Sequence, residues 1–164
     1  MNCPACGAAM RLDEQDDHFR CDFCGRLHFP EPDKDGVRVL AKAAGTRCPV
    51  CSEDLMHAAV GGARVLSCSA CRGLLIPAET FLFVTRVLRA HADRAFVPAR
   101  SLAARELDRR ICCPRCNRLM DTHPYAGPGN IVIDNCARCH VNWLDSGELR
   151  RVASAPDPQY TAHE

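Results

Sequence analysis

The sequence predicts a small, metal-stabilised fold of mixed α and β structure. In it, three four-cysteine zinc ribbons follow one another, and an α-helical segment separates the second from the third. Three observations lead to this prediction. Thirteen of the 164 residues are cysteine, and twelve of them form Cys-x-x-Cys pairs. Aromatic residues make up only 5% of the chain, so one large core is not expected. Units this small seldom stabilise themselves by burial alone.

The six pairs alternate between two types, so the repeating unit contains two pairs. The first, third and fifth pairs read CPAC, CPVC and CPRC, and the others read CDFC, CSAC and CARC. The pairs within a unit are 14, 16 and 19 residues apart, close to the spacing of four-cysteine zinc sites. The expected metal ligands are Cys3, Cys6, Cys21 and Cys24 in the first unit, Cys48, Cys51, Cys68 and Cys71 in the second, and Cys113, Cys116, Cys136 and Cys139 in the third.

Metal is favoured over disulfides at these cysteines. Disulfides belong mainly to secreted chains, and the N-terminal stretch MNCPACGAAM has neither the basic nor the apolar region of a signal peptide. We therefore expect a cytoplasmic protein with three zinc ions per chain. An iron centre of the rubredoxin type takes the same four ligands, so the sequence leaves iron open. Four thiolates per unit leave no free coordination position for a catalytic zinc. They also leave no place for a histidine ligand, and Cys112 becomes a spare thiol.

The repeat extends beyond the cysteines, which indicates three copies of one module. A Cys-x-x-Cys turn commonly needs a positive φ after its second cysteine, which glycine adopts freely and asparagine and histidine tolerate. The runs ARVLSC and NIVIDNC favour strands and end at closing pairs, which predicts short antiparallel hairpins. The six turn positions are Gly7, Gly25, Ser52, Arg72, Asn117 and His140, and the matching side chains four residues after each closing pair are His28, Leu75 and Trp143.

The segment between the second and third units is predicted to be helical, because apolar residues recur there at helical spacing. Pro98 divides it into helices over 78–96 and 99–110. Its seven arginines could face nucleic acid or an acidic partner, or could simply form a solvated surface. The expected organisation is a first ribbon in 1–29, a linker or strand in 30–45, a second ribbon in 46–77, a helical connector in 78–110, a third ribbon with a C-terminal helix in 111–153, and a disordered tail in 154–164.

The third unit resembles the transcription factor IIB-type zinc-finger family of small bacterial zinc-ribbon proteins. The resemblance rests on CPRC, then CARC, and then WLDSGEL over residues 143–149. It covers about 40 residues, and the second unit shares it more weakly. It implies zinc binding and, more remotely, transcription. From the residues themselves, Asp145 is expected to be the N-cap of a helix, with Glu148 completing a capping box.

These observations favour a non-enzymatic zinc protein that docks on a protein partner, with the transcription machinery as one candidate. No pair of a nucleophile and a base stands out, so no catalytic residue is expected. Direct nucleic-acid binding is the alternative, and we expect it to be weak. The net charge of +1 names no partner, and no apolar run reaches the length of a membrane span.

Overall fold

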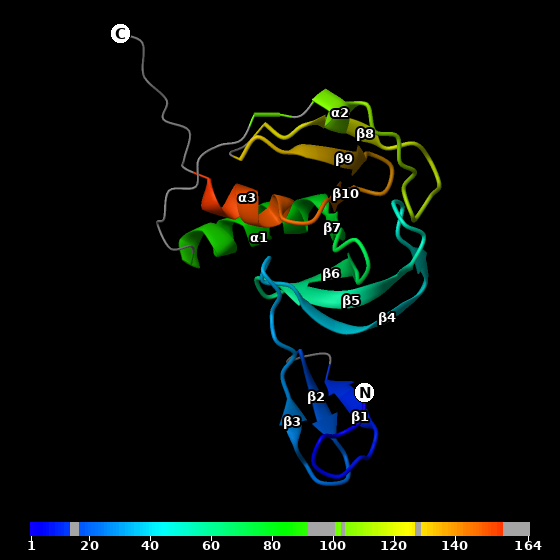
Figure 1. Cartoon of the computed structure of the whole chain (residues 1–164), viewed down its shortest axis with the longest axis vertical. Helices are drawn as coiled ribbons and strands as arrows, with labels where there is room; N and C mark the ends of the chain where they lie inside the picture. Colours follow the sequence, from blue (N-terminus) through cyan, green and yellow to red (C-terminus); the bar gives the residue numbers. More distant parts are fainter. Residues whose placement is uncertain (14–16, 92–100, 103, 127–128, 156–164) are drawn as a thin grey trace.

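The described residues form two β-sheets, one in the first unit and one shared by the second and third (Figure 1). A computed structural model describes residues 1–13, 17–91, 101–102, 104–126 and 129–155. The elements are β1 (Met10–Asp13), β2 (His18–Cys21), β3 (Leu27–His28), β4 (Arg38–Arg47), β5 (Asp54–Val60), β6 (Ala63–Cys68), β7 (Leu74–Pro77), α1 (Ala78–His91), α2 (Ala104–Leu107), β8 (Asp121–Pro124), β9 (Val132–Cys136), β10 (Val141–Leu144) and α3 (Glu148–Ser154).

All three units are three-stranded antiparallel meanders in the same register. Within each unit, the residue two places before the closing Cys-x-x-Cys pair lies opposite the residue four places after it. The three register pairs are Phe19 with His28, Leu66 with Leu75, and Asp134 with Trp143. The runs ARVLSC and NIVIDNC contain β6 and β9, as expected. The sequence repeat is therefore a repeat of one strand arrangement.

The second and third units meet along their third strands. Strand β7 pairs with β10 antiparallel, so the strand order of the larger sheet is β4-β5-β6-β7-β10-β9-β8. We call this β7–β10 pairing the seam. The sequence predicts two separate ribbons, whereas the structure joins them in one sheet. Only the first unit keeps a sheet of its own, which lies at the end of the molecule away from α1 and α3 (Figure 1).

Both faces of the larger sheet are buried, and both cores cross the seam. Helices α1 and α3 cover one face and contact each other. The core on this helix face contains Val37, Ala58, Val60, Val65, Leu74, Ile76, Phe81, Val84, Ile131, Ile133, Leu144, Leu149 and Val152. The opposite face, which we call the cysteine face, contains Cys48, Leu55, Cys68, Leu75, Ile111, Cys113, Met120, Cys136, Val141 and Trp143. Side chains alternate between the two faces along each strand, as the pleat requires.

The helical segment is shorter than expected where it can be described. Helix α1 begins at Ala78, as the periodicity predicts, and is described to His91; residues 92–98 lie outside the described part. Residues 99, 100 and 103 of the second expected helix, over 99–110, also lie outside the described part, and among its described residues the helix α2 spans Ala104–Leu107. Two residues after this helix, the Arg109 side chain pairs with Asp134 and Asp145. Residues 30–36 have no helix or strand, and residues 156–164 of the expected tail lie outside the description.

Candidate metal centres

The twelve cysteines of the six pairs form three groups of four. In each group the sulfur atoms all lie within 4.8 Å of one another, and no histidine belongs to any of the three. Closest sulfur–sulfur distances are 3.5 and 3.6 Å in the first unit, 3.4 and 3.5 Å in the second, and 3.6 Å in the third. With zinc–sulfur bonds of about 2.3 Å, a regular tetrahedron places its sulfur atoms about 3.8 Å apart. The three groups therefore fit a tetrahedral thiolate-bound ion.

These distances do not fit disulfides, whose sulfur atoms are about 2.05 Å apart. All thirteen cysteines are free thiols. The first cysteine of every pair is buried and the second is exposed or half-buried. Cys112 is exposed and belongs to none of the groups, as expected for a spare thiol.

Each Cys-x-x-Cys turn has the backbone that the sequence predicts. The residue after the second cysteine has a positive φ in all six turns, from 50° at His140 to 75° at Gly7. Even Ser52 (62°) and Arg72 (59°) adopt it, although their side chains suit it less well than glycine. The N–H groups of Ser52 and Arg72 donate to the carbonyls of Cys48 and Cys68, at 3.0 and 2.9 Å. The backbone hydrogen bond of the turn therefore determines the positive φ, whichever side chain stands at this position.

The electrostatics of the groups favour thiolate at some cysteines and oppose it at others. A hydrogen bond from the backbone of Glu53 lowers the pKa of Cys51 to about 7, and one from Arg118 does the same for Cys116. The pKa of Cys139 is instead raised to about 12, chiefly by its contact with the Cys116 sulfur. Four thiolates this close repel one another, so all four ionise together only around a cation.

The second and third groups lie on the same face of the larger sheet, with one aromatic ring in that core. Trp143 is fully buried there and faces Leu75 across the seam. Its ring lies against Gly73 of the second unit so closely that a Cβ at position 73 would be 2.1 Å from a ring carbon. The two sites thus share a packed core in which the tryptophan of one unit needs the glycine of the other.

The WLDSGEL residues have structural roles, one of which differs from expectation. The carboxylate of Glu148 accepts the backbone N–H of Asp145 at 2.8 Å, which is one half of the expected capping box. The other half is absent: Gly147 is the N-cap, with φ 84° and no side-chain cap. Asp145 does not cap the helix because its side chain accepts the indole N–H of Trp143 at 3.2 Å and pairs with Arg109.

A buried polar network, which the sequence motifs do not predict, lies beside the third group. Asp134 is fully buried, pairs with Arg109, and accepts the hydroxyl of Thr122 at 2.6 Å. Desolvation by itself would lower the pKa of Arg109, but the carboxylates of Asp134 and Asp145 outweigh this effect and raise the pKa above its usual value. The sequence holds one sign of this network. Asp134 lies two residues before Cys136 in the strand-favouring run NIVIDNC, at a position where the alternation of the strand turns the side chain toward the core.

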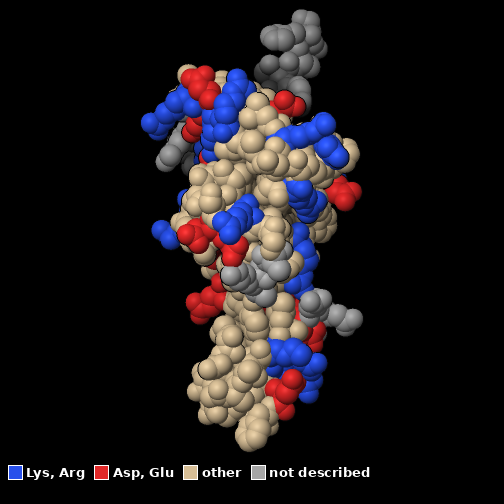
Figure 2. Space-filling view, turned by 90° about the vertical axis from the view of Figure 1, so that its right-hand side faces the viewer, with Lys and Arg blue, Asp and Glu red and all other residues tan. Residues whose placement is uncertain are grey.

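A basic binding face is one of the two interpretations of the seven arginines in residues 78–110, and fewer than seven of them are available for it. Arg109 is committed to the network, and Arg89 donates to the carbonyls of Val152 and Ala155, both at 2.8 Å. Arg94 and Arg100 lie outside the described residues. Figure 2 shows basic and acidic side chains interspersed over one face of the molecule, without a large area of single sign.

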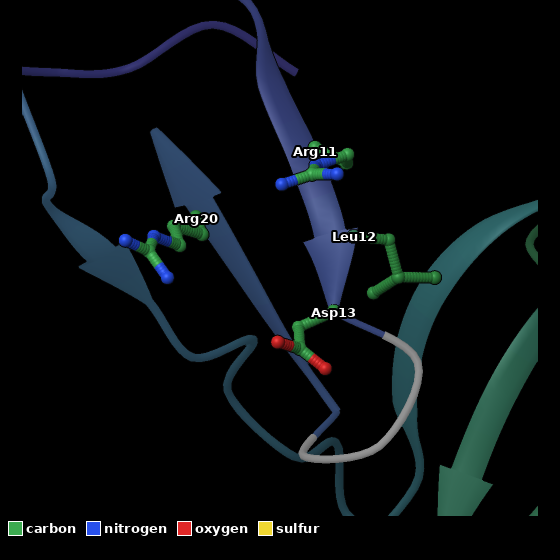
Figure 3. A pocket seen from close by; sticks show the side chains of 4 residues that line it. All are labelled: Arg11, Leu12, Asp13 and Arg20. Carbon is green, nitrogen blue, oxygen red and sulfur yellow. The ribbon is translucent and has the colours of Figure 1, made fainter. Parts of the chain in front are cut away.

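The outer surface of the first unit carries a shallow pocket lined by Arg11, Leu12, Asp13 and Arg20 (Figure 3). Arg11 and Arg20 lie directly opposite each other on β1 and β2. Arg11 is bonded to Asp22 at 3.1 Å, and Asp13 lies beside the pair, whereas Leu12 points away from the charged side chains (Figure 3). Charges of both signs therefore meet in this pocket.

Comparison of the chain with protein-family models, curated proteins and solved structures gives no match. Among the described residues, no helix is long and apolar enough to cross a membrane.

Proposed function

We propose that the protein is a non-enzymatic zinc protein in which three zinc ribbons hold docking surfaces in place. The observation that carries this proposal is the presence of three groups of four cysteines, each with the spacing of a tetrahedral thiolate site. A bound zinc would cross-link the two turns of its unit and neutralise the thiolates. A closed site with four protein ligands stabilises structure and has no position for a substrate.

Metal analysis of the purified protein tests the zinc assignment. We expect three zinc ions per chain by native mass spectrometry and elemental analysis, which also separate zinc from iron. A thiol reagent should modify one cysteine, Cys112, in the loaded protein and all thirteen after chelation and unfolding. Two metal ions or fewer in intact protein would remove a site, and the first unit, which is the most divergent, would be the one in doubt.

The docking part of the proposal rests on apolar side chains that the fold leaves uncovered. On α1, Leu82 is 49% exposed and Phe83 is 53% exposed, and adjacent exposed apolar side chains are common at protein interfaces. The resemblance of the third unit to the transcription factor IIB-type family makes the transcription machinery one candidate partner. We place the protein among the adaptors on these two grounds.

A pull-down from native lysate tests docking. We expect the loaded protein to capture a protein partner whether or not nuclease is present. The double variant Leu82→Glu/Phe83→Glu should lose that partner, whereas Leu119→Glu, at a similarly exposed apolar position on the third unit, should keep it. Capture that nuclease abolishes would instead indicate a nucleic-acid bridge.

Direct nucleic-acid binding is the second candidate, supported by two exposed arginines, Arg11 and Arg20, and the exposed ring of Phe29, all of which belong to the first unit. Basic side chains beside exposed aromatics are typical of single-strand binding surfaces. Two phosphate contacts would give a log–log salt slope of roughly −1.4 to −1.8. We expect fluorescence anisotropy to show weak or no binding at physiological salt. Sub-micromolar, sequence-selective binding would promote this candidate over the adaptor.

A further inference from the structure

The first unit ends in a strand edge that no other strand pairs. In the described residues β3 pairs only with β2, so its outer side is an edge of the three-stranded sheet. The N–H of Cys21 donates to the carbonyl of Arg26, and Phe19 lies opposite His28. Because backbone groups alternate between the two sides of an antiparallel strand, those of Leu27 and Phe29 point to the free edge. Unpaired edges of this kind favour pairing with another strand.

The same edge is paired in the other two units of the chain. Strands β3, β7 and β10 hold the same register within their own units, so they present the same outward backbone groups. Strand β7 uses this edge to pair with β10, and the pairing is symmetric about Leu75 and Trp143, which occupy the position of His28. On either side of that centre Leu74 lies opposite Leu144 and Ile76 lies opposite Asn142. The chain thus shows how this module associates with a copy of itself.

The first unit also leaves exposed the side chains that the seam buries. Leu74, Ile76 and Leu144 are at most 3% exposed because the partner strand and the helices α1 and α3 cover them. Their counterparts in the first unit, Leu27 and Phe29, are 47% and 59% exposed. No helix follows β3, since residues 30–36 lead directly toward β4. An apolar pair therefore flanks the free edge.

We propose that two copies of this chain associate through their first units, with β3 of one copy antiparallel to β3 of the other. The two-fold axis would pass between the two His28 side chains, which take the places of Leu75 and Trp143. Leu27 would then lie opposite the partner's Phe29, and Phe29 opposite the partner's Leu27. Each copy supplies the same surface, as a closed two-fold interface requires.

The charges beside β3 fit a second copy of the chain, and the small size of the contact determines how strongly the two copies associate. In this register Arg26 lies opposite the partner's Pro30, next to the partner's Glu31, so exposed side chains of opposite charge meet at both ends. Four or five residues on each side bury less than the roughly 1,200 Å² of a standard stable interface, so the dimer should be weak and transient. We expect a dissociation constant on the order of 100 µM.

Sedimentation velocity of the zinc-loaded full chain, from micromolar to millimolar concentration, measures the association. The wild type should pass from monomer to dimer. Leu27→Lys and Phe29→Glu should each weaken self-association by about tenfold or more, because each places an unpaired charge in the apolar contact. The control Leu119→Glu, at an exposed apolar position of the third unit that lies outside the Cys-x-x-Cys pairs, should leave it unchanged. Zinc content and circular dichroism of every variant should match the wild type.

Mixing the two weakened variants tests the register itself. An equimolar mixture of Leu27→Lys and Phe29→Glu should form a heterodimer, because the new lysine and glutamate face each other across the axis. In the wild type, the amide protons of Leu27 and Phe29 should exchange more slowly as the protein concentration rises. A chain that stays monomeric to about 1 mM, association that neither variant weakens, or a mixture that does not recover would overturn the proposal.

Discussion

Replacing Gly73 by alanine tests the shared core of the second and third units, because this single methyl group would collide with a side chain of the other unit. Its Cβ would lie 2.1 Å from a ring carbon of Trp143, where ordinary contact begins near 3.4 Å. The ring or the strand must therefore move by more than about 1 Å in a fully buried site. Overpacking of this kind typically costs about 1–3 kcal/mol, and we expect the upper end because two further ring carbons lie at 2.8 Å.

Urea denaturation of the zinc-loaded protein, followed by far-ultraviolet circular dichroism, measures this cost. Trp143→Leu, which copies Leu75 at the matching position, makes room for the methyl group. The double variant should therefore lose less stability than the sum of the two single variants, by about 1 kcal/mol or more. Gly62→Ala is the control, since its Cβ meets nothing within 4 Å and only its positive φ is strained. A Gly73→Ala variant whose cost is unaffected by Trp143→Leu would refute the shared core.

Three further predictions follow from the same sheet and network. Cys136→Ser should remove amide-exchange protection from the second unit as well as the third and leave the first unit protected; loss confined to residues 113–149 would show that the seam carries no stability. Arg109→Met should cost about 3–5 kcal/mol in urea denaturation because it leaves the buried carboxylate of Asp134 unpaired, and adding Asp134→Asn should recover part of that cost. Burial raises the pKa of Glu148 to about 8, from 4.5 in the unfolded chain. The folded protein is therefore most stable at low pH, where Glu148 is protonated in both states, and it loses stability as the pH rises through this interval. Glu148→Gln should therefore become more stable relative to the wild type between about pH 5 and 8, and a constant difference would contradict the raised pKa.

The local features of this fold could be predicted because they depend on short stretches of sequence. The spacing of the cysteines determines which four meet, and the turn hydrogen bond requires a positive φ even where Ser52 or Arg72 stands. The strand-favouring run before Cys68 forms β6, and the apolar periodicity after Pro77 forms α1. Each of these outcomes involves residues that are close in the chain or are tied together by one site.

The association of the second and third units could not be predicted in the same way. The seam pairs Leu75 with Trp143, 68 residues apart, and the edge of a strand has no sequence signature of its own. Asp145 looks like a helix cap because an acid three residues before Glu148 suits that role. Its partner Arg109 lies 36 residues away, and only the folded chain shows that the salt bridge takes precedence over the cap.

The seam has a consequence for how the protein acquires metal. Cys68 and Cys136 belong to different sites but pack into one core with Leu75 and Trp143. An ion bound at either site would order the third strand of that unit, β7 or β10, and the third strand of the other unit pairs with it. Binding of the first ion therefore reduces the free energy needed to order the second site, so the second ion binds more tightly. Chains with only one of these two sites filled should be scarce during loading. The first unit, which has its own sheet, should fill independently, so the chain would take up its metal as one pair and one single ion.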